Sequence, residues 1–308
     1  MPLTDGRRAP GCAAPADGRA GLGGRRGVSE RPTAVRWRVL IERQGRAAAE
    51  NMATDQALLE ESDRTGRAFL RLYRFDPRCI SFGRNEPARE RYDAGAIARL
   101  ACDVVRRPTG GRAVWHEHEV TYAVAAPVAA FGSLRDAYRE IHQRLAAALR
   151  ALGADATLAP DRLPRPSTAV HRWHACFAAP SGGEVLVHGR KVIGSAQVRQ
   201  GGAFLQHGSI LLAGSQDQLS AISRQPPAAS DSATTLSAVL GRSVTFEEVA
   251  DGIVRAWGQD LPSTALDRLR PPWVCGAGGG CETRSRAGFP ASPRPPAAAY
   301  RPPADRSC

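Results

Sequence analysis

Lysine is almost absent from this chain, which has 42 lysine and arginine residues but a single lysine, Lys191. An arginine side chain stays protonated in proteins, whereas a lysine amine can lose its proton, and its charge responds to burial. A chain that uses arginine wherever a plain cation is sufficient therefore indicates that position 191 requires the chemistry of an amine. The alternative is that an ordinary strand residue escaped replacement by chance. Lys191 lies in a glycine-rich segment, 176–212, that also contains Cys176 and His207.

Long apolar runs are absent as well. No stretch reaches the length of a membrane-spanning helix, and residues 1–18 lack the apolar core of a secretory signal peptide. These absences argue against a membrane span and against secretion. We therefore expect a cytoplasmic protein that has no membrane partner.

Paired cysteines are a third absence. The seven cysteines are odd in number and scattered, and none forms a Cys-x-x-Cys pair, which argues against a disulfide framework and against a zinc site. The sequence HEHE at 116–119 falls short of the metal-binding pattern His-Glu-x-x-His and is typical of a strand edge. We therefore expect no bound metal.

The net charge of +12 makes nucleic-acid binding a question to be tested against the distribution of charge. Residues 1–36 contain seven arginines and three acidic residues, and residues 261–308 contain the same numbers. Both tails are rich in proline, glycine and alanine, a composition that buries too little apolar surface to fold. We therefore expect disordered basic tails at 1–36 and 261–308, a catalytic domain at 37–260, and no nucleic-acid partner.

Hydrophobic periodicity over residues 37–260 predicts an α+β domain in which helices flank mixed β-sheets. Helices are expected at 50–62, 92–100, 133–153, 216–223, 233–241 and 245–258, with Ser133 capping the start of the third and Gly153 ending it. Strands are expected at 37–42, 68–75, 79–86, 102–107 and 120–124, and three more over 184–212 with turns at 188–189 and 200–202. The turn at Asp76-Pro77 makes a hairpin the simplest arrangement of 68–75 and 79–86.

A glycine-rich loop carries arginines between two of these strands. Gly110 and Gly111 lie next to Arg107 and Arg112, and His116 follows. Such a loop allows backbone amides to approach an anionic or carbonyl-bearing ligand closely. Taken alone, a Gly-Gly pair is more often just a tight turn.

Cys176 and Lys191 together indicate nucleophilic chemistry. A thiol of ordinary pKa is only a few per cent thiolate at neutral pH, so a nucleophilic cysteine needs a cation or a base beside it. Lys191 follows Cys176 by 15 residues, and a loop and a strand between them allow the lysine to return to the thiol and lower its pKa. His207 and His116 are alternatives for this role. The plain alternative for Cys176 is a small buried apolar residue.

Four motifs, taken together, resemble a known superfamily. They are RRPTGGRAVWH, EVTYAV, GRKVIGSAQ and QHGSILL, and in this order they are similar to the lipoate and biotin protein ligases, in particular the lipoyl branch. The segment CFAAPSGGEVLVHGRK resembles the cysteine-dependent octanoyltransferases of that branch. The resemblance implies a lipoate-protein ligase fold and transfer of an octanoyl group from octanoyl-acyl carrier protein to a lipoyl-domain lysine. The expected acceptor is a protein such as glycine cleavage H protein or a 2-oxoacid dehydrogenase E2 subunit, and no cofactor is implied.

The resemblance also assigns roles to residues. Cys176 corresponds to the cysteine that carries the acyl thioester, and Lys191 to the lysine that lowers the pKa of its thiol. The implied substrate-binding residues are Ser81, Gly83, Arg107, Thr109, Gly110, Gly111, His116, Gly194, Ser195, Gln197, His207 and Gly208. Two features depart from the family pattern: Glu86 stands where glutamine is usual, and the sequence after Asp260 does not continue as the family's last helices.

Several alternatives stay open. An ATP-dependent lipoate ligase shares the arginine-glycine and GRK motifs but needs no cysteine. A second transferase family places its lysine before its cysteine, the reverse of the order here. An amidotransferase that passes octanoyl between lipoyl domains shares the chemistry, and a binding protein without catalysis would keep the fold.

Overall fold

The computed structural model describes residues 35–160, 177, 182–224 and 232–258. The expectations for the two tails therefore fall almost wholly outside the described residues, as does Cys176. Within the described part of the chain, no helix is long and apolar enough to cross a membrane.

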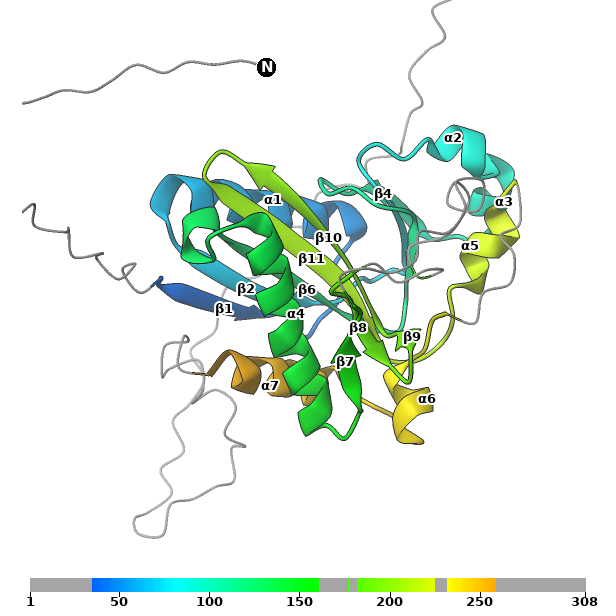
Figure 1. Ribbon diagram of the computed structural model, residues 1–308. Coiled ribbons are helices and arrows are strands. Elements are labelled where there is room, and N and C mark those ends of the chain that lie inside the picture. Colours follow the sequence, from blue (N-terminus) through cyan, green and yellow to red (C-terminus); the bar gives the residue numbers. More distant parts are fainter. Residues whose placement is uncertain (1–34, 161–176, 178–181, 225–231, 259–308) are drawn as a thin grey trace, which may run out of the picture. The chain divides into compact units, whose positions relative to one another are not determined.

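A five-stranded sheet forms the centre of the fold (Figure 1), with the strand order β1-β2-β6-β11-β10. Its strands are β1 (Trp37–Ile41), β2 (Ala68–Tyr73), β6 (Glu119–Pro127), β11 (Ala203–Leu211) and β10 (Ile193–Gln200). β1 and β2 are parallel, and the other neighbours are antiparallel. β2 is buried along its whole length, as expected for a strand covered on both faces.

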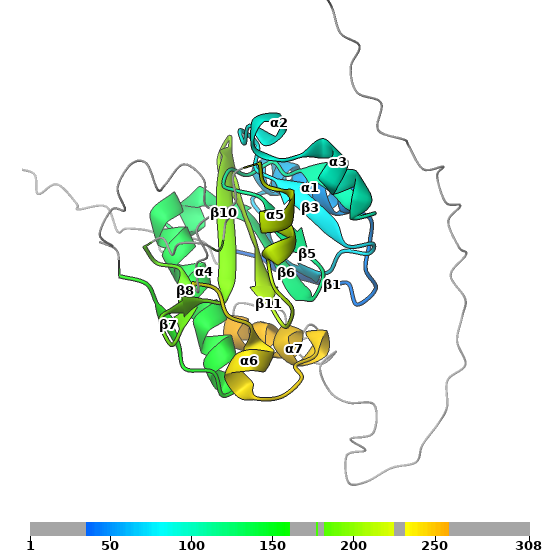
Figure 2. The ribbon, with the colours of Figure 1, turned by 90° about the vertical axis from the view of Figure 1, so that its right-hand side faces the viewer.

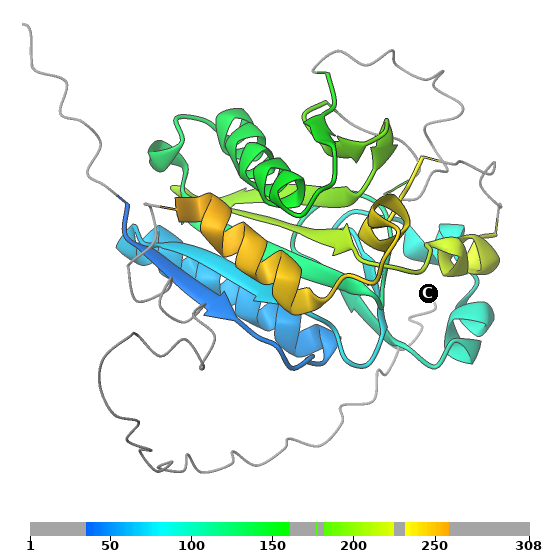
Figure 3. The ribbon, with the colours of Figure 1, turned by 90° about the horizontal axis from the view of Figure 1, so that it is seen from below.

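Three helices cover the two faces of this sheet (Figure 3). α1 (Ala48–Thr65) lies on one face, and α4 (Leu134–Ala151) and α7 (Phe246–Trp257) lie on the other. Ser133 caps α4 as predicted, because its side chain accepts from the backbone N–H of Asp136. α1 is longer than the predicted 50–62, and it ends at Gly66, whose φ of 68° lies in the left-handed region that favours glycine.

A second, three-stranded sheet has the order β4-β3-β5, with β4 at Asp103–Arg106, β3 at Cys79–Phe82 and β5 at Val114–His116. Figure 2 shows α2 (Ala88–Arg91), α3 (Ala94–Arg99) and α5 (Asp217–Ile222) around it. The predicted hairpin of 68–75 with 79–86 is wrong. β2 is paired on both sides by β1 and β6, so the chain passes to the other sheet, where β3 is also central.

A third sheet joins β7 (Ala156–Leu158), β8 (Val185–Val187) and β9 (Arg190–Lys191). The predicted turn at His188-Gly189 is present, with φ values of 50° and 74° that suit a tight hairpin. The structure has four strands over 184–212 instead of the three expected. The reason is that 190–191 pair with β8, whereas β10 begins at Ile193 and pairs with β11 in the central sheet. A 3-10 turn (Val128–Ala130) and α6 (Leu236–Leu240) complete the described elements.

Candidate active site

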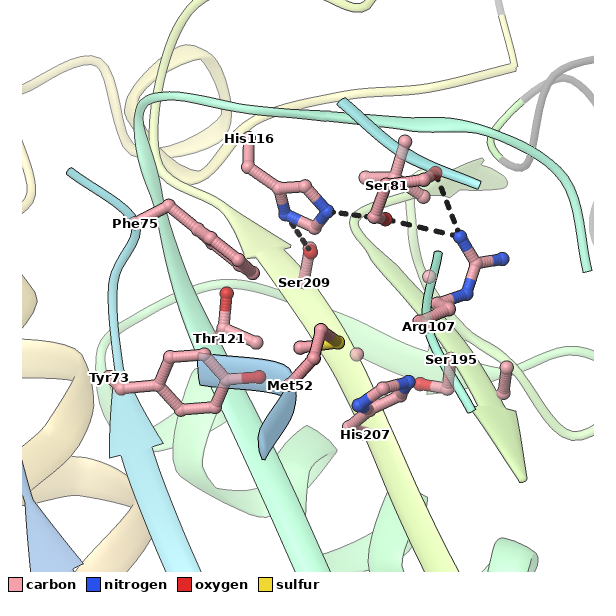
Figure 4. A pocket seen from close by; sticks show the side chains of 14 residues that line it. Met52, Tyr73, Phe75, Ser81, Arg107, His116, Thr121, Ser195, His207 and Ser209 are labelled. Atoms are coloured by element: carbon pink, nitrogen blue, oxygen red, sulfur yellow. Dashed lines mark hydrogen bonds between the residues drawn. The ribbon is translucent and has the colours of Figure 1, made fainter. Parts of the chain in front are cut away.

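A pocket of about 360 Å³, part of it open to solvent, lies where the central sheet meets the sheet β4-β3-β5 (Figure 4). Seven of the residues assigned to substrate binding line it: Ser81, Arg107, His116, Gly194, Ser195, His207 and Gly208. Met52, Phe75 and Val114 give it an apolar portion, so the pocket combines an apolar wall with polar groups.

The other five assigned residues lie around the pocket without lining it. Thr109 contacts the pocket residue His207, and Gly110 belongs to the loop held by Arg107. Gly83 packs closely against that loop, because a Cβ atom on Gly83 would collide with the backbone of Gly111. Gln197 bonds to Gln206 on the neighbouring strand. These residues therefore shape the pocket from outside.

One wall of the pocket is a chain of hydroxyl, imidazole and carboxylate. His116 Nδ1 lies 2.6 Å from Glu119 Oε1, and its Nε2 lies 2.7 Å from Ser81 Oγ. Because a carboxylate only accepts, His116 donates to Glu119 through Nδ1, which turns Nε2 towards the Ser81 hydroxyl. Arg107 also donates to the Ser81 Oγ and carbonyl oxygen, at 3.1 and 3.0 Å. The orientation of Ser81 is thus fixed from two sides.

Arg107 also fixes the glycine loop. Its second terminal nitrogen donates to the carbonyl oxygens of Gly110 and Arg112, at 2.8 and 2.7 Å. The planar fork of a guanidinium can hold several acceptors at once, which a lysine cannot do in the same geometry. Arg107 therefore organises the loop from inside, and this geometry assigns its side chain a positioning role.

The opposite wall contains a second chain of the same kind. His207 Nδ1 lies 2.9 Å from Asp55 Oδ2, and its Nε2 lies 2.7 Å from Thr109 Oγ1. Asp55 also accepts from Arg71 and Tyr73, at 2.7 and 2.8 Å. Burial raises the pKa of Tyr73 well above its usual range, and the Asp55 carboxylate adds to this, so the tyrosine stays a donor. The hydrophobic pattern of the sequence offered no signal for Asp55.

Gly208 allows the close approach of two side chains in the central sheet. It lies between Tyr122 and Ser195 in register, and a Cβ atom at this position would be 2.9 Å from the tyrosine ring and 2.7 Å from Ser195 Oγ. Because glycine has no Cβ atom, Tyr122 and Ser195 can form a hydrogen bond of 2.6 Å. A larger residue at 208 would push this pair apart, which accounts for the glycine in the His-Gly motif.

Ser195 belongs to a buried chain of hydrogen bonds whose directions can be derived. His142 Nδ1 donates to the Gly183 carbonyl at 2.8 Å, so its Nε2 accepts from Ser195 at 2.8 Å. Ser195 then accepts from Tyr122, which accepts from Gln206 at 2.9 Å. Burial lowers the pKa of His142 to about 4, with its bond to Gly183 opposing this, so the ring is neutral. The proton of Ser195 is thus directed away from the pocket, towards α4.

Lys191 is buried and paired. Its side chain is 2% exposed, and Nζ lies 2.7 Å from Glu184 Oε1. The same Nζ lies 5.4 Å from the ring centroid of Phe177, the residue that follows Cys176 in the sequence. The Phe177 ring also packs against Gly194, where a Cβ atom would be only 2.8 Å away. Lys191 and a pocket strand therefore both meet the residue next to the candidate nucleophile.

Glu184 was missed by the sequence analysis, although a signal for it exists. The turn at 188–189 places Leu186 opposite Lys191. Glu184 precedes Leu186 by two residues, so its side chain lies on the same face of the chain as that of Leu186. Diagonal neighbours in an antiparallel pair lie on one face and within reach of long side chains. The predicted turn was thus enough to predict the Glu184–Lys191 contact.

The sequence of the chain is similar to that of a known protein family. A model of the lipoyl protein ligase A/B catalytic domain matches residues 47–258. The chain belongs to this family. Octanoyltransferase LipM of Kyrpidia tusciae is 39% identical over 250 residues, which cover 76% of this chain and 89% of that protein. Octanoyltransferase LipM of Bacillus subtilis is 38% identical over 189 residues, which cover 59% and 68%.

Solved structures support the same fold. Lipoate-protein ligase A bound with ATP superimposes with a TM-score of 0.61 at 22% identity, covering 73% of this chain and 85% of that one. A bi-partite lipoate protein ligase from Thermoplasma acidophilum gives a TM-score of 0.57 at 21% identity, covering 73% and 84%. The predicted α+β class and the resemblance to the lipoyl branch are therefore confirmed.

Glu86, the departure from the family pattern, lies beside the pocket and not in its lining. Its carboxylate accepts from the Tyr92 hydroxyl at 2.9 Å and from the Gly83 N–H at 3.3 Å. It thus stabilises the turn after β3. Among the described residues, no group of three or more histidine, cysteine, aspartate or glutamate side chains is placed to hold a metal ion.

Proposed function

We propose that this protein is an octanoyltransferase that moves an octanoyl group from octanoyl-acyl carrier protein to a lysine of an apo lipoyl domain. A thioester on Cys176 is the proposed intermediate. The observation that carries the proposal is the position of Lys191. It is buried beside Phe177, and Phe177 is the residue that follows Cys176 in the chain. The relatives named octanoyltransferase support the same reaction.

The proposed chemistry has two acyl transfers. The Cys176 thiolate attacks the carbonyl carbon of the carrier-bound thioester, the carrier C–S bond breaks, and the carrier thiolate leaves and takes up a proton. The acceptor amine then attacks the carbonyl carbon of the enzyme thioester, the C–N bond of the amide forms, the C–S bond to Cys176 breaks, and the proton that the amine loses passes to the released sulfur or to solvent. The positive charge of Lys191 favours the thiolate in both steps. Because the donor is already a thioester, neither nucleotide nor cofactor is needed.

The pocket is the proposed site of the octanoyl chain. Its apolar part, formed by Met52, Phe75 and Val114, suits an alkyl chain. Arg107 holds the glycine loop, and the His116 and His207 chains hold the walls. The sequence-assigned binding residues therefore act, in this proposal, partly by contact and partly by positioning.

A lipoyl-domain protein is the proposed class of acceptor. The Thermoplasma ligase is described together with its E2 lipoyl domain, and an E2 subunit or a glycine cleavage H protein is the kind of acceptor we propose here. The proposed place of action is the cytoplasm. Two alternatives keep the same fold: an ATP-dependent lipoate ligase, and an amidotransferase between lipoyl domains.

A single set of reactions separates these functions. The protein is mixed with an apo lipoyl domain and with octanoyl-acyl carrier protein, with octanoate plus ATP, or with an octanoylated lipoyl domain of a second kind. Transfer from the carrier protein without ATP is expected. Transfer that requires ATP would identify a ligase, and transfer only between lipoyl domains would identify an amidotransferase.

The intermediate has its own test. Intact-protein mass spectrometry is expected to show one octanoyl adduct that neutral hydroxylamine removes. Cys176→Ala should not form it, whereas Cys102→Ala, at a partly buried free cysteine outside the pocket lining, should form it normally. An adduct that persists in Cys176→Ala would refute the proposed intermediate.

A further inference from the structure

The ion pair between Glu184 and Lys191 is buried on both sides. Nζ and Oε1 are 2.7 Å apart, and the two side chains are 4% and 2% exposed. Opposite charges interact strongly where water is excluded, and a charged hydrogen bond of this length is among the stronger ones in proteins. In this ion pair Lys191 is an ammonium, which has no lone pair and cannot act as a nucleophile.

Helix α4 holds Glu184 in place. His142 donates to the carbonyl of Gly183, which fixes the backbone immediately before Glu184. Tyr138, one turn earlier on α4, donates to Glu184 Oε1 at 3.5 Å. His142 is neutral and adds no charge beside the pair. The carboxylate is thus oriented by helix α4, which also holds the pocket residue Ser195 through His142.

A thioester next to a lysine creates a chemical hazard. A neutral amine attacks the thioester carbonyl, the C–N bond forms, the C–S bond breaks, and the departing thiolate takes the proton from nitrogen. The product is an amide, which a thiol does not reverse, so a single event would inactivate the enzyme. Lys191 Nζ lies 5.4 Å from the ring of Phe177, and Phe177 is bonded directly to the residue that would carry the acyl group.

We propose that Glu184 protects Lys191 from acylation by the enzyme's own thioester, while orienting its positive charge. The inference rests on the proposed function, because it requires an acyl group on Cys176. Glu184 is thus a positioning residue that acts through Lys191. It explains how a lysine can serve a thioester enzyme without becoming its acceptor.

The test uses the full chain and octanoyl-acyl carrier protein, without any acceptor. Wild type, Glu184→Gln and Glu184→Asp are incubated with the donor, treated with neutral hydroxylamine to remove thioesters, and analysed by intact mass and peptide mapping. Glu184→Gln should accumulate a hydroxylamine-resistant octanoyl adduct on Lys191 and lose transfer activity at the same rate. Glu184→Asp, which keeps the charge, should restore protection.

The expected rate of adduct formation can be given, and the adduct can be assigned to one residue. Resistant adduct should form about tenfold faster or more in Glu184→Gln, the change that a loss of roughly 1.4 kcal/mol of charge stabilisation produces. Because the chain contains a single lysine, any octanoyl amide lies on Lys191 or on the N-terminal amine, and peptide mapping separates the two. Glu140→Gln is the matched control, since Glu140 lies on α4 and pairs with Arg144 at 2.6 Å, outside the pocket lining. It should behave as wild type.

The outcomes also separate this inference from the proposed function. If Glu184→Gln forms the labile adduct on Cys176 but no resistant adduct on Lys191, the inference is wrong and the function stands. If wild type forms no labile adduct, the proposed function itself fails. Should Glu184→Gln not fold, Glu184→Ala with added formate serves as the second variant. Formate that fills the vacated carboxylate site should suppress the resistant adduct. If formate leaves the amount of resistant adduct unchanged, the proposed protection is wrong.

Discussion

Asp55 and His207 are 152 residues apart in the sequence and are joined by a hydrogen bond of 2.9 Å between Oδ2 and Nδ1. The bond connects α1 to β11 across one face of the central sheet. Because the carboxylate accepts from Nδ1–H, the ring is oriented so that Nε2 contacts the hydroxyl of Thr109, which lies in the glycine loop. A carboxylate on a helix thereby determines how the loop is held against the pocket.

Replacing Asp55 by asparagine should destabilise the protein. Asp55 and Arg71 form an ion pair in which both side chains are 0% exposed. Removing the Asp55 charge leaves the buried Arg71 with Glu42, at 2.8 Å, as its remaining carboxylate, and we expect a loss of up to about 3 kcal/mol in the free energy of unfolding. Urea unfolding at neutral pH measures the change. Glu60→Gln, on the exposed side of the same helix, should cost almost nothing, and an equal effect of both variants would contradict the account.

His142 should make the stability depend on pH. Burial lowers its pKa to about 4 in the folded protein, against about 6.5 for an unperturbed histidine. Between these values the unfolded chain binds a proton that the folded protein does not. Stability is therefore fully present above about pH 6.5 and is lost as pH falls towards 4, by roughly 3 kcal/mol from this group.

The matched variants for this prediction are His142→Asn and His118→Gln. Asparagine can still donate to Gly183, so His142→Asn should be less stable at pH 7.5 but should show a flatter dependence of stability on pH between 6.5 and 4. His118 has a side chain that is 59% exposed, and its replacement should leave the wild-type pH dependence unchanged. Thermal unfolding across this pH range tests both, and equal slopes in wild type and His142→Asn would exclude His142 as the source.

Two glycine-to-alanine substitutions should have opposite effects. At Gly208 a Cβ atom would be 2.7 Å from Ser195 Oγ and would collide with the carbonyl of Gly194, so Gly208→Ala should cost roughly 1–3 kcal/mol and reduce transfer. At Gly252, within α7, the nearest atoms would be at 3.6 Å, an ordinary contact, so Gly252→Ala should stabilise by about 0.5–1 kcal/mol. Differential scanning calorimetry measures both, and a destabilised Gly252→Ala would show that helix α7 lacks this space.

Features determined by neighbouring residues could be predicted from the sequence. Ser133 caps α4, and the turn at 188–189 connects β8 to β9. Both depend on interactions within a few residues, so local chemistry is sufficient to predict them. The start of α1 was harder to place, because Ala47 precedes it and offers no side-chain cap. Polar residues such as Asn51 and Asp55 on its buried side also weaken the hydrophobic pattern.

Features determined by the order of strands could not be predicted in the same way. The hairpin expected for 68–75 and 79–86 failed because each strand has two other partners, supplied by distant parts of the chain. The same applies to the candidate site. The family resemblance indicated His207 and Ser195, whereas their partners Asp55 and His142 come from two helices on opposite faces of the sheet.

The last prediction concerns what Lys191 does. An arginine cannot be acylated and is the cation that this chain uses everywhere else, so it would be the safer residue if positive charge alone were needed. Retention of lysine argues that the site requires a compact ammonium. At 2% exposure, with Glu184 at 2.7 Å and Phe177 nearby, the larger planar guanidinium would also displace its neighbours. Lys191→Arg should therefore lose activity about as far as Lys191→Ala, by roughly 10²-fold or more.

The rate of Cys176 alkylation as a function of pH separates the two roles of this lysine. A thiol beside a cation reacts as thiolate below its free pKa of about 8.5, so reactivity at low pH should persist in Lys191→Arg and disappear in Lys191→Ala. Arg190→Lys, one residue away and partly exposed, is the control and should retain activity. If Lys191→Arg keeps most activity, charge is all that the position supplies. If the rate of Cys176 alkylation depends on pH in the same way in wild type, Lys191→Arg and Lys191→Ala, then Lys191 does not act on the thiol. His207 or His116 then becomes the candidate for that role.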